Sequence, residues 1–252
     1  MIAGKRITAL AIFLRGCNQS NPSSVWNKNI KKNLFQIILL FSLKKTYYFG
    51  LIMRIAIAGN IGAGKTSLTK QLSKSLKYKA YYEDVISNPY LDDFYNHMER
   101  WSFNLQIYFL NSRFKQLVSI DNSKENVIQD RTIYEDAFIF APNLNSMGLM
   151  PQRDYENYLS LFDTMLNLVK PPDLLVYLQS SIPNLVNKIH KRGRDYEKSI
   201  SIEYLSRLNE RYEAWITNYD SGKLLKINVD DLDFVEKKSD YETILKLIKE
   251  EL

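Results

Sequence analysis

Cysteine and histidine are nearly absent from this 252-residue chain, which has one cysteine, Cys17, and two histidines, His97 and His190. A single cysteine excludes a disulfide framework and any Cys-ligated zinc or iron–sulfur site. The two histidines lie far apart in sequence and indicate neither a metal site nor a catalytic dyad. A body without cysteine is typical of a reducing compartment, so we expect a cytoplasmic protein.

Long hydrophobic runs are also missing. The two longest apolar stretches near the N-terminus, Ile7–Leu14 and Leu34–Leu43, fall well short of the roughly 20 residues that cross a bilayer as a helix. The sequence therefore predicts no transmembrane helix, and no membrane partner is expected.

Acidic residues are missing from residues 1–52, which contain eight lysines and arginines. The whole chain has a formal charge of +6, a value that would ordinarily suggest a nucleic-acid or membrane partner. Removing this leader leaves 26 basic against 28 acidic residues in residues 53–252, a net charge of −2. The basicity thus belongs to the leader, and we expect no nucleic-acid partner.

The basic leader, residues 1–52, has three possible explanations. It has no periodic amphipathic pattern, and Met53 stands directly before the first convincing strand, which favours translated upstream sequence and a start-site artefact. A basic, acid-free segment containing serine is also typical of an organelle transit peptide, and weak association with a membrane surface is the third possibility. We expect the working domain to comprise residues 53–252.

Short apolar strands alternate with helical patterns along residues 53–252, which predicts a parallel sheet covered by helices on both faces. The expected strands are Arg54–Ala58, Tyr78–Tyr82, Asn126–Gln129, Leu174–Leu178 and Leu224–Val229. The expected helices are Thr66–Leu76, Arg100–Ile120, Asp154–Val169, Ile182–Lys191, Ile202–Tyr219 and Tyr241–Leu252. This pattern predicts one α/β domain with a five-stranded parallel sheet.

A glycine-rich loop follows the first strand and matches G-x-x-x-x-G-K-[ST] between a strand and a helix, the context in which this motif binds phosphate. Its backbone N–H groups can surround a phosphate, Lys65 can reach the β and γ phosphates, and the Thr66 hydroxyl can ligate Mg²⁺. We assign to the nucleotide Gly59, Asn60, Ile61, Gly62, Ala63, Gly64, Lys65, Thr66 and Ser67.

GTPases, motor ATPases and small-molecule kinases all use such a loop. A GTPase should also carry an Asn-Lys-x-Asp motif that reads guanine, and neither Asn27-Lys28 nor Asn187-Lys188 is followed by the required aspartate. The sequence therefore disfavours a GTPase.

Four further motifs follow the loop in order: Tyr82-Glu83-Asp84-Val85, Arg100-Trp101-Ser102-Phe103, Asp130-Arg131-Thr132 and Lys191-Arg192-Gly193-Arg194. With these motifs, residues 53–252 resemble the deoxynucleoside kinases, most closely the bacterial deoxyadenosine and deoxyguanosine kinases. The resemblance implies a P-loop kinase fold with an arginine-bearing lid, ATP and Mg²⁺ as cofactors, a deoxynucleoside substrate and a homodimer.

The resemblance assigns the chemistry to three side chains besides Lys65. Glu83 would accept the proton of the sugar 5′-hydroxyl during attack on the γ-phosphoryl group. Asp130 would bind Mg²⁺, and Arg131 would stabilise phosphoryl charge and hold Glu83 in place. Family members often have proline after this glutamate, whereas Asp84 follows here, so the local turn is expected to differ.

Gln106 and Arg113 are seven residues apart, two helical turns, so both should project from one helix face. The resemblance implies that they read the nucleobase together with Asp136, and that Phe140 stacks on the base. Their joint presence favours purine deoxynucleosides and deoxycytidine over thymidine. Trp101 and Phe103 are expected to wall the same pocket.

The resemblance also assigns residues to the sugar and to ATP. Tyr95, in a nearly continuous helical stretch leading to Gln106, and Glu197 would bind the sugar 3′-hydroxyl. The arginines of the lid would close over the phosphates, and a loop after the last strand would hold the adenine of ATP. These residues are Arg192, Arg194, Asp233 and Phe234.

The resulting prediction is an ATP-dependent deoxynucleoside kinase that forms the 5′-monophosphate of deoxyadenosine or deoxyguanosine in nucleotide salvage. One rival is a nucleoside monophosphate kinase of the thymidylate kinase type, which Glu83 disfavours because its carboxylate would repel the substrate's phosphate. The other rival is a non-enzymatic ATP-dependent switch, for which the sequence shows no partner surface.

Overall fold

The structure is a computed structural model that describes residues 52–85, 87–194, 197 and 199–252. Apart from Ile52, the leader predicted over residues 1–52, including Cys17, lies outside the described residues. Within the described ranges, no helix combines the length and the apolar character needed to cross a membrane.

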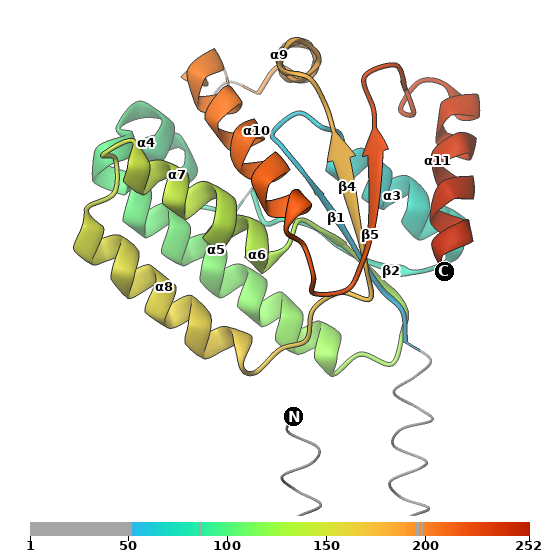
Figure 1. The fold of residues 1–252 in the computed structure, drawn as a ribbon, viewed down its shortest axis with the longest axis horizontal. Helices are drawn as coiled ribbons and strands as arrows, with labels where there is room; N and C mark the ends of the chain where they lie inside the picture. The colour runs from blue at the N-terminus through green and yellow to red at the C-terminus, as the bar shows by residue number, and fades with distance from the viewer. Residues whose placement is uncertain (1–51, 86, 195–196, 198) are drawn as a thin grey trace, which may run out of the picture. The chain divides into compact units, whose positions relative to one another are not determined.

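Five parallel strands form the central sheet, as predicted (Figure 1). They are β1 (Arg54–Gly59), β2 (Lys79–Tyr81), β3 (Val127–Asp130), β4 (Leu174–Gln179) and β5 (Lys223–Asn228), and each lies within one or two residues of its predicted range. Their order is β2-β3-β1-β4-β5, so the chain crosses over between neighbouring strands. Because all strands are parallel, their carboxyl ends share one edge, where ligands bind in sheets of this kind.

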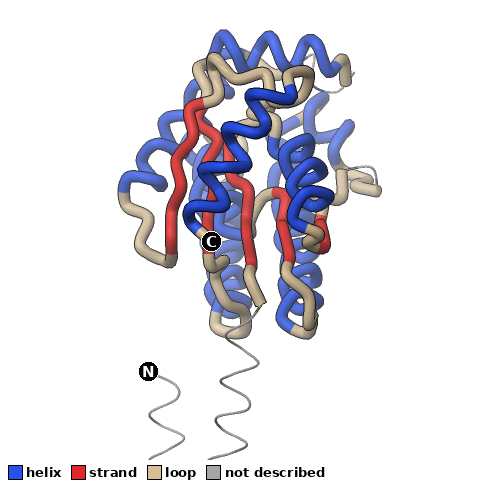
Figure 2. Tube along the Cα trace, turned by 90° about the vertical axis from the view of Figure 1, so that its right-hand side faces the viewer, coloured by secondary structure: helices blue, strands red, loops and turns tan. Residues whose placement is uncertain are grey.

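Helices cover both faces of the sheet because successive side chains of a strand point to opposite sides. Ile55 and Ile57 of β1 pack on one side with α3 (Lys65–Leu76) and α11 (Lys238–Glu251). Ala56 and Ala58 pack on the other side, in one cluster with side chains of α5 (Met98–Asp121), α7 (Ala141–Ser146) and α10 (Ile202–Thr217), and the small alanine side chains let these helices approach the sheet closely. Figures 1 and 2 show the sheet between these two layers.

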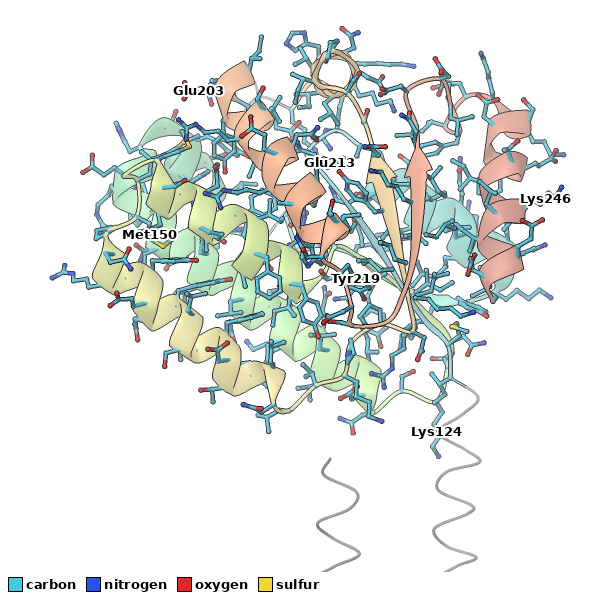
Figure 3. The ribbon with its side chains drawn as sticks, viewed as in Figure 1. Lys124, Met150, Glu203, Glu213, Tyr219 and Lys246 are labelled. Carbon is cyan, nitrogen blue, oxygen red and sulfur yellow. The ribbon has the colours of Figure 1, made fainter. Side chains whose placement is uncertain are left out.

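The longer helices agree with their predicted ranges. They are α5 (Met98–Asp121), α8 (Gln152–Leu166), α9 (Ile182–Arg192) and α10 (Ile202–Thr217). Their buried positions recur at helical spacing, as with Tyr158 and Phe162 of α8, which pack on α5. Full burial of side chains this large contributes roughly 1.5–3 kcal/mol each, so these contacts fix the helical layer. In Figure 3, Lys246 and Glu203 point outward, whereas Met150 lies among the helices.

Four short helices were not predicted: α4 (Leu91–Asn96), α6 (Ile133–Glu135), the π-helical turn η1 (Asp136–Phe140) and α7 (Ala141–Ser146). They are too short to show a periodic apolar pattern. The stretch from Tyr95 to Gln106 is nearly continuous, as expected: α4 and α5 are separated at His97 alone, whose φ and ψ of −144° and 72° are not helical.

Candidate active site

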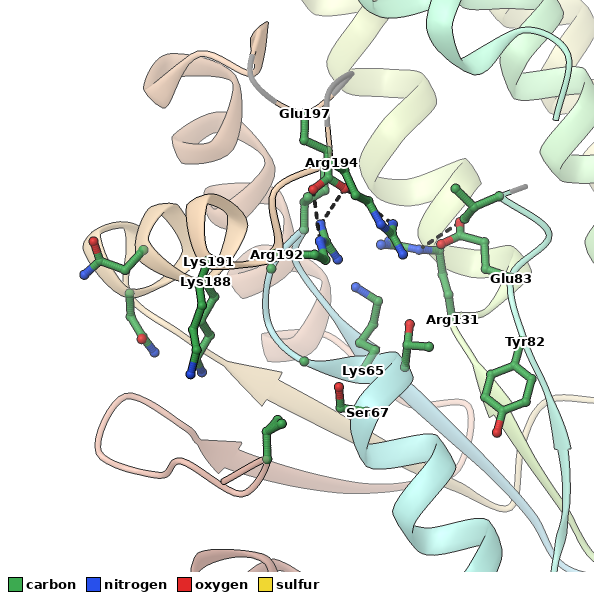
Figure 4. Close-up of a pocket in the computed structure, with 18 of the residues that line it drawn as sticks. Lys65, Ser67, Tyr82, Glu83, Arg131, Lys188, Lys191, Arg192, Arg194 and Glu197 are labelled. Atoms are coloured by element: carbon green, nitrogen blue, oxygen red, sulfur yellow. Dashed lines mark hydrogen bonds and ion pairs between the residues drawn. The ribbon is translucent and has the colours of Figure 1, made fainter. Parts of the chain in front are cut away.

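A cavity of about 1020 Å³ opens at the carboxyl ends of β1 and β3, and the predicted donor and acceptor residues line it together. Figure 4 shows Lys65 and Ser67 of the loop near Glu83 and Arg131. The predicted site residues on its wall are Ile61, Gly62, Gly64, Lys65, Thr66, Ser67, Glu83, Tyr95, Gln106, Arg131, Asp136, Phe140, Arg192, Arg194, Glu197, Asp233 and Phe234. Gly59, Asn60, Ala63, Arg113 and Asp130 are not among the lining residues.

The glycine-rich loop turns sharply before α3 because Gly64 has a φ of 96°, a conformation that side chains rarely adopt. A Cβ atom added at Gly64 would lie 2.6 Å from Cζ of Phe234, so the loop also needs glycine for space. Lys65 is buried at the helix start and donates to the carbonyl oxygens of Gly59 at 2.7 Å and Asn60 at 2.9 Å. The loop therefore gathers N–H groups, a helix N-terminus and an ammonium at one point.

Burial and, to a lesser extent, the neighbouring charge of Arg131 lower the pKa of Lys65 to about 7, although the charges of Glu135 and Asp130 oppose the shift. A bound polyphosphate would supply the negative charge that this ammonium lacks. The loop is thus suited to an anionic ligand.

Asp130 ends β3 directly beside the loop, and its Oδ2 accepts a hydrogen bond of 2.6 Å from the Thr66 hydroxyl. The carboxylate is buried, and its Oδ1 has no hydrogen-bond partner among the described residues. Burial raises the pKa of Asp130, and Lys65 opposes the shift. Oxygen ligands from a carboxylate and a hydroxyl are those that Mg²⁺ prefers, so Thr66 and Asp130 fit this ion.

Glu83 follows β2 and forms ion pairs with two buried arginines, Arg113 and Arg131. The distance from its Oε1 to Nε of Arg131 is 3.4 Å. Burial alone would raise the pKa of Glu83, but the charges of Arg131 and Arg113 outweigh it and lower the pKa to about 2. Glu83 is therefore a firmly ionised carboxylate at the edge of the cavity.

Gln106 and Asp136 line the far end of the cavity, and the buried Arg113, which does not line it, donates from Nε to Asp136. Gln106 precedes Arg113 by two turns of α5, and its Oε1 is unpartnered among the described residues. Burial raises the pKa of Asp136 to about 6, against the opposing charge of Arg113, so the pair is ionised at neutral pH. An unsatisfied buried amide is costly, which indicates a hydrogen-bonding ligand here.

Aromatic side chains complete the wall, but not all of those expected. Phe140 lies against Arg131, with 4.6 Å from its ring centre to the guanidinium carbon. Trp101 and Phe103 do not line the cavity, contrary to expectation: Trp101 packs on Tyr90, and Phe103 packs between α5 and α8. The sequence pattern did not distinguish these packing contacts from contacts with the cavity.

The lid arginines contact a carboxylate in this structure (Figure 4). Arg192 donates to both oxygens of Glu197, at 2.9 and 2.5 Å, and Arg194 lies 3.5 Å from the same group. Residues predicted separately for the phosphates and for the sugar thus form one cluster over the cavity.

Two buried residues beside the site were missed by sequence reasoning, Glu135 and Tyr212. Glu135 could have been found from the pattern Thr132-x-x-Glu135, which forms a capping box at the start of α6. No local pattern identifies Tyr212, because it reaches the site from α10.

A phosphate-binding loop between β1 and α3, with a carboxylate and hydroxyl for a cation and an acceptor cavity beside them, defines a P-loop phosphotransferase. A family model described as deoxynucleoside kinase matches residues 55–252. The chain belongs to the deoxynucleoside kinase family.

Individual relatives agree with this membership. The chain is 42% identical to the deoxyadenosine/deoxycytidine kinase of Bacillus subtilis over 195 residues, covering 76% of this chain and 89% of the relative. It is 39% identical to the deoxyadenosine kinase of Lactobacillus acidophilus, covering 80% and 97%. The structure of deoxyadenosine kinase from M. mycoides with bound dATP matches with a TM-score of 0.69 and 34% identity, covering 78% of this chain and 99% of that chain.

Proposed function

We propose that the protein transfers the γ-phosphate of ATP to the 5′-hydroxyl of a purine deoxynucleoside, deoxyadenosine or deoxyguanosine, and forms the 5′-monophosphate for nucleotide salvage. The observation that carries this proposal is the position of Glu83, an ionised carboxylate in the cavity that the phosphate loop also lines. Deoxyadenosine is favoured because the relatives described above are named for it.

The donor side would hold ATP through the loop N–H groups and Lys65, with Asp233 and Phe234 beside the adenine. Thr66 and Asp130 would hold Mg²⁺, which when bound neutralises charge on the phosphates. Arg192 and Arg194 would leave Glu197 and contact the phosphates when both substrates are present. Arginine suits this role because its planar guanidinium donates two parallel hydrogen bonds.

On the acceptor side, the 5′-hydroxyl would donate a hydrogen bond to Glu83 while its oxygen attacks in line. A carboxylate with a pKa of about 2 is a weak base, which suffices because the transition state of phosphoryl transfer is loose and the proton can leave late. Arg131 would stabilise the charge on the transferred group. Catalysis would then consist of positioning and charge stabilisation without a covalent intermediate.

The nucleobase would lie against Phe140 and hydrogen-bond to Gln106, Arg113 and Asp136. The unpartnered Oε1 of Gln106 and Nη1 of Arg113 support this, because both are buried and have no partner among the described residues. Tyr95 and Glu197 would bind the sugar 3′-hydroxyl, which requires Glu197 to exchange its arginine contacts for the sugar.

The test is ATP-dependent phosphorylation by the full-length protein of each deoxynucleoside, each ribonucleoside and each deoxynucleoside monophosphate. We expect turnover of deoxyadenosine or deoxyguanosine and none of the monophosphates, because Glu83 repels a phosphate at the 5′ position. Turnover of monophosphates alone would identify a monophosphate kinase. Nucleotide binding without turnover of any acceptor would identify an ATP-dependent switch, and either result would overturn the proposal.

We further propose that the protein acts as a homodimer, as the resemblance implies. Exposed apolar side chains support this, among them Val118 on α5 and Leu161 on α8, which are 41% and 40% exposed. Light scattering after size exclusion should give twice the mass of the chain. A mass of one chain at micromolar concentration would contradict the proposal.

Residues 53–252 are proposed to carry the activity, in the cytoplasm. The family match, which begins at residue 55, supports this division. A chain starting at Met53 should match the full-length protein in kcat and KM for both substrates. A large loss of activity would show that the leader contributes.

A further inference from the structure

Arg131 adopts a backbone conformation that is uncommon for a residue with a side chain. Its φ is 70°, in the left-handed region. Its N–H nevertheless donates to the carbonyl oxygen of Ile57 at 3.0 Å and so extends the pairing of β3 with β1. Such strained residues cluster at functional sites and persist only where the surroundings hold them.

Two buried groups hold the guanidinium from the side opposite Glu83. Nη1 of Arg131 donates to the Tyr212 hydroxyl at 2.7 Å, and that hydroxyl donates to Oε1 of Glu135 at 2.9 Å. The same Oε1 lies 3.4 Å from Nη1 of Arg131. With Nη1 occupied in this way, Nε of Arg131 faces Glu83, 3.4 Å away.

Glu135 also bonds to the phosphate loop. The N–H of Gly59, the first residue of that loop, donates to its Oε1 at 3.2 Å. Its Oε2 accepts from the N–H of Thr132 at 2.7 Å, which fixes the turn that carries Arg131. A single carboxylate, with no exposed surface, therefore joins the donor loop, the Arg131 turn and α10.

We propose that Glu135 and Tyr212 are positioning residues for the kinase reaction. They hold the Arg131 guanidinium in a fixed position relative to both Glu83 and the phosphate loop, although neither Glu135 nor Tyr212 lines the cavity. This inference rests on the proposed function, since it assumes that Arg131 acts on the transferred group. Glu135 and Tyr212 would thus support the residues that contact the substrates, a role that none of the sequence motifs assigned.

The chain offers a matched control for Tyr212. Tyr177 is equally buried, its ring stacks on that of Tyr212 with centres 5.8 Å apart, and its hydroxyl donates to Glu213 at 3.0 Å. Each tyrosine thus has a buried hydroxyl bonded to a glutamate, but Glu213 has no contact with the active site among the described residues. Replacing either tyrosine with phenylalanine removes the same atom from the same stack.

The experiment compares Tyr212→Phe with Tyr177→Phe in kcat, in KM for ATP and deoxyadenosine, in the Kd of ATP and in Tm. Loss of a hydrogen bond to a charged group is expected to lower kcat of Tyr212→Phe by roughly 10- to 100-fold, with both KM values and the Kd of ATP within about threefold. Tyr177→Phe should keep kcat within about twofold. If Tm falls by a similar amount in both variants, the difference in kcat between them reports the positioning effect and not a loss of stability.

Equal kcat in the two variants would overturn the inference, as would a loss in Tyr212→Phe that appears in KM or Tm alone. Glu135→Gln is the second variant, because glutamine keeps the shape and removes the charge. It should lower kcat by at least as much as Tyr212→Phe with ATP binding retained, and wild-type kcat in Glu135→Gln would also count against the inference. An inactive wild-type protein would instead contradict the proposed function itself.

Discussion

The two halves of the active site are built in different ways. The centre of the proposed donor half is one continuous stretch, the phosphate loop from Gly59 to Ser67, in which backbone N–H groups, a helix N-terminus and Lys65 are fixed by neighbours in sequence. The acceptor half joins side chains from β2, α5, β3 and η1 through buried ion pairs, with Arg113 bonded to both Glu83 and Asp136. A local motif can carry the first half, whereas only the packing of distant elements creates the second.

The difference also determines how each half should respond to change. A loop that binds through its backbone N–H groups should lose affinity when its backbone conformation changes, so its glycines should be the most sensitive positions. A network of charges fails through any missing partner, because the remaining buried charge is left uncompensated. Four changes test this contrast.

Glu83→Gln should have the largest effect, because it removes both the acceptor for the hydroxyl proton and the partner of two arginines. We expect kcat to fall by roughly 10³-fold, in the range typical of general bases, while the Kd of ATP stays within about twofold. Single-turnover kinetics with ATP titration measures both. A similar loss of ATP binding would mean that the two halves do not act separately.

Gly64→Ala should damage the donor half alone. The added Cβ would strain a φ of 96° and meet Phe234, at a cost of about 1–3 kcal/mol, so KM for ATP should rise roughly 10- to 100-fold. Gly148→Ala is the control, since Gly148 has a comparable φ of 73° with no atom within 4 Å of an added Cβ. Should KM for deoxyadenosine rise as much as KM for ATP in Gly64→Ala, the halves would be coupled through the loop.

A fall in pH from 7 to 5 should weaken the acceptor half. Burial raises the pKa of Asp136 to about 6, so the protonated carboxyl prevails below pH 6. The folding stability that comes from this tighter proton binding is present at low pH and is lost as pH rises through 6. Glu83 stays ionised, since its pKa is about 2 and its contribution to stability is lost only as pH falls toward that value. KM for deoxyadenosine should therefore rise several-fold, by up to about tenfold per pH unit below 6.

Asp136→Asn checks this assignment. The variant should have a raised KM for deoxyadenosine that no longer depends on pH between 5 and 7, while the protein remains folded by circular dichroism. The same pH dependence in Asp136→Asn and in the wild type would exclude Asp136 as the titrating group.

The smallest effect concerns protons at Lys65. Because its pKa is lowered to about 7, most of the protein lacks this ammonium at pH 8, and the phosphates of ATP should restore it. Calorimetry at pH 8 in buffers of different ionisation enthalpy should show uptake of a fraction of one proton per ATP. Lys65→Met should abolish this uptake, and its persistence would point to another group.

Much of the fold followed from periodicity, and the failures have physical causes. Strands β1 and β4 were found because nearly all of their residues are apolar and buried, and helices such as α8 and α10 because their buried residues recur at helical spacing. The helical stretch around His97 was expected to be nearly continuous, but the sequence did not locate the break, because residues on both sides have helical character and only the backbone at His97 separates α4 from α5. The short helix α6 depends on the capping box of Thr132 rather than on an apolar stripe.

The sequence alone determined the phosphate loop, because a glycine-rich loop between a strand and a helix acts through backbone groups that neighbouring residues fix. It also determined the order of strands and helices and, through several motifs, the family. Tertiary structure alone decided which charges meet. Glu83 pairs with Arg113 from α5 and with Arg131, which follows β3, and Arg131 is held by Tyr212 from α10, because parallel strands bring their carboxyl ends to one edge of the sheet. Contacts across such distances in the chain depend on packing, which no local pattern encodes.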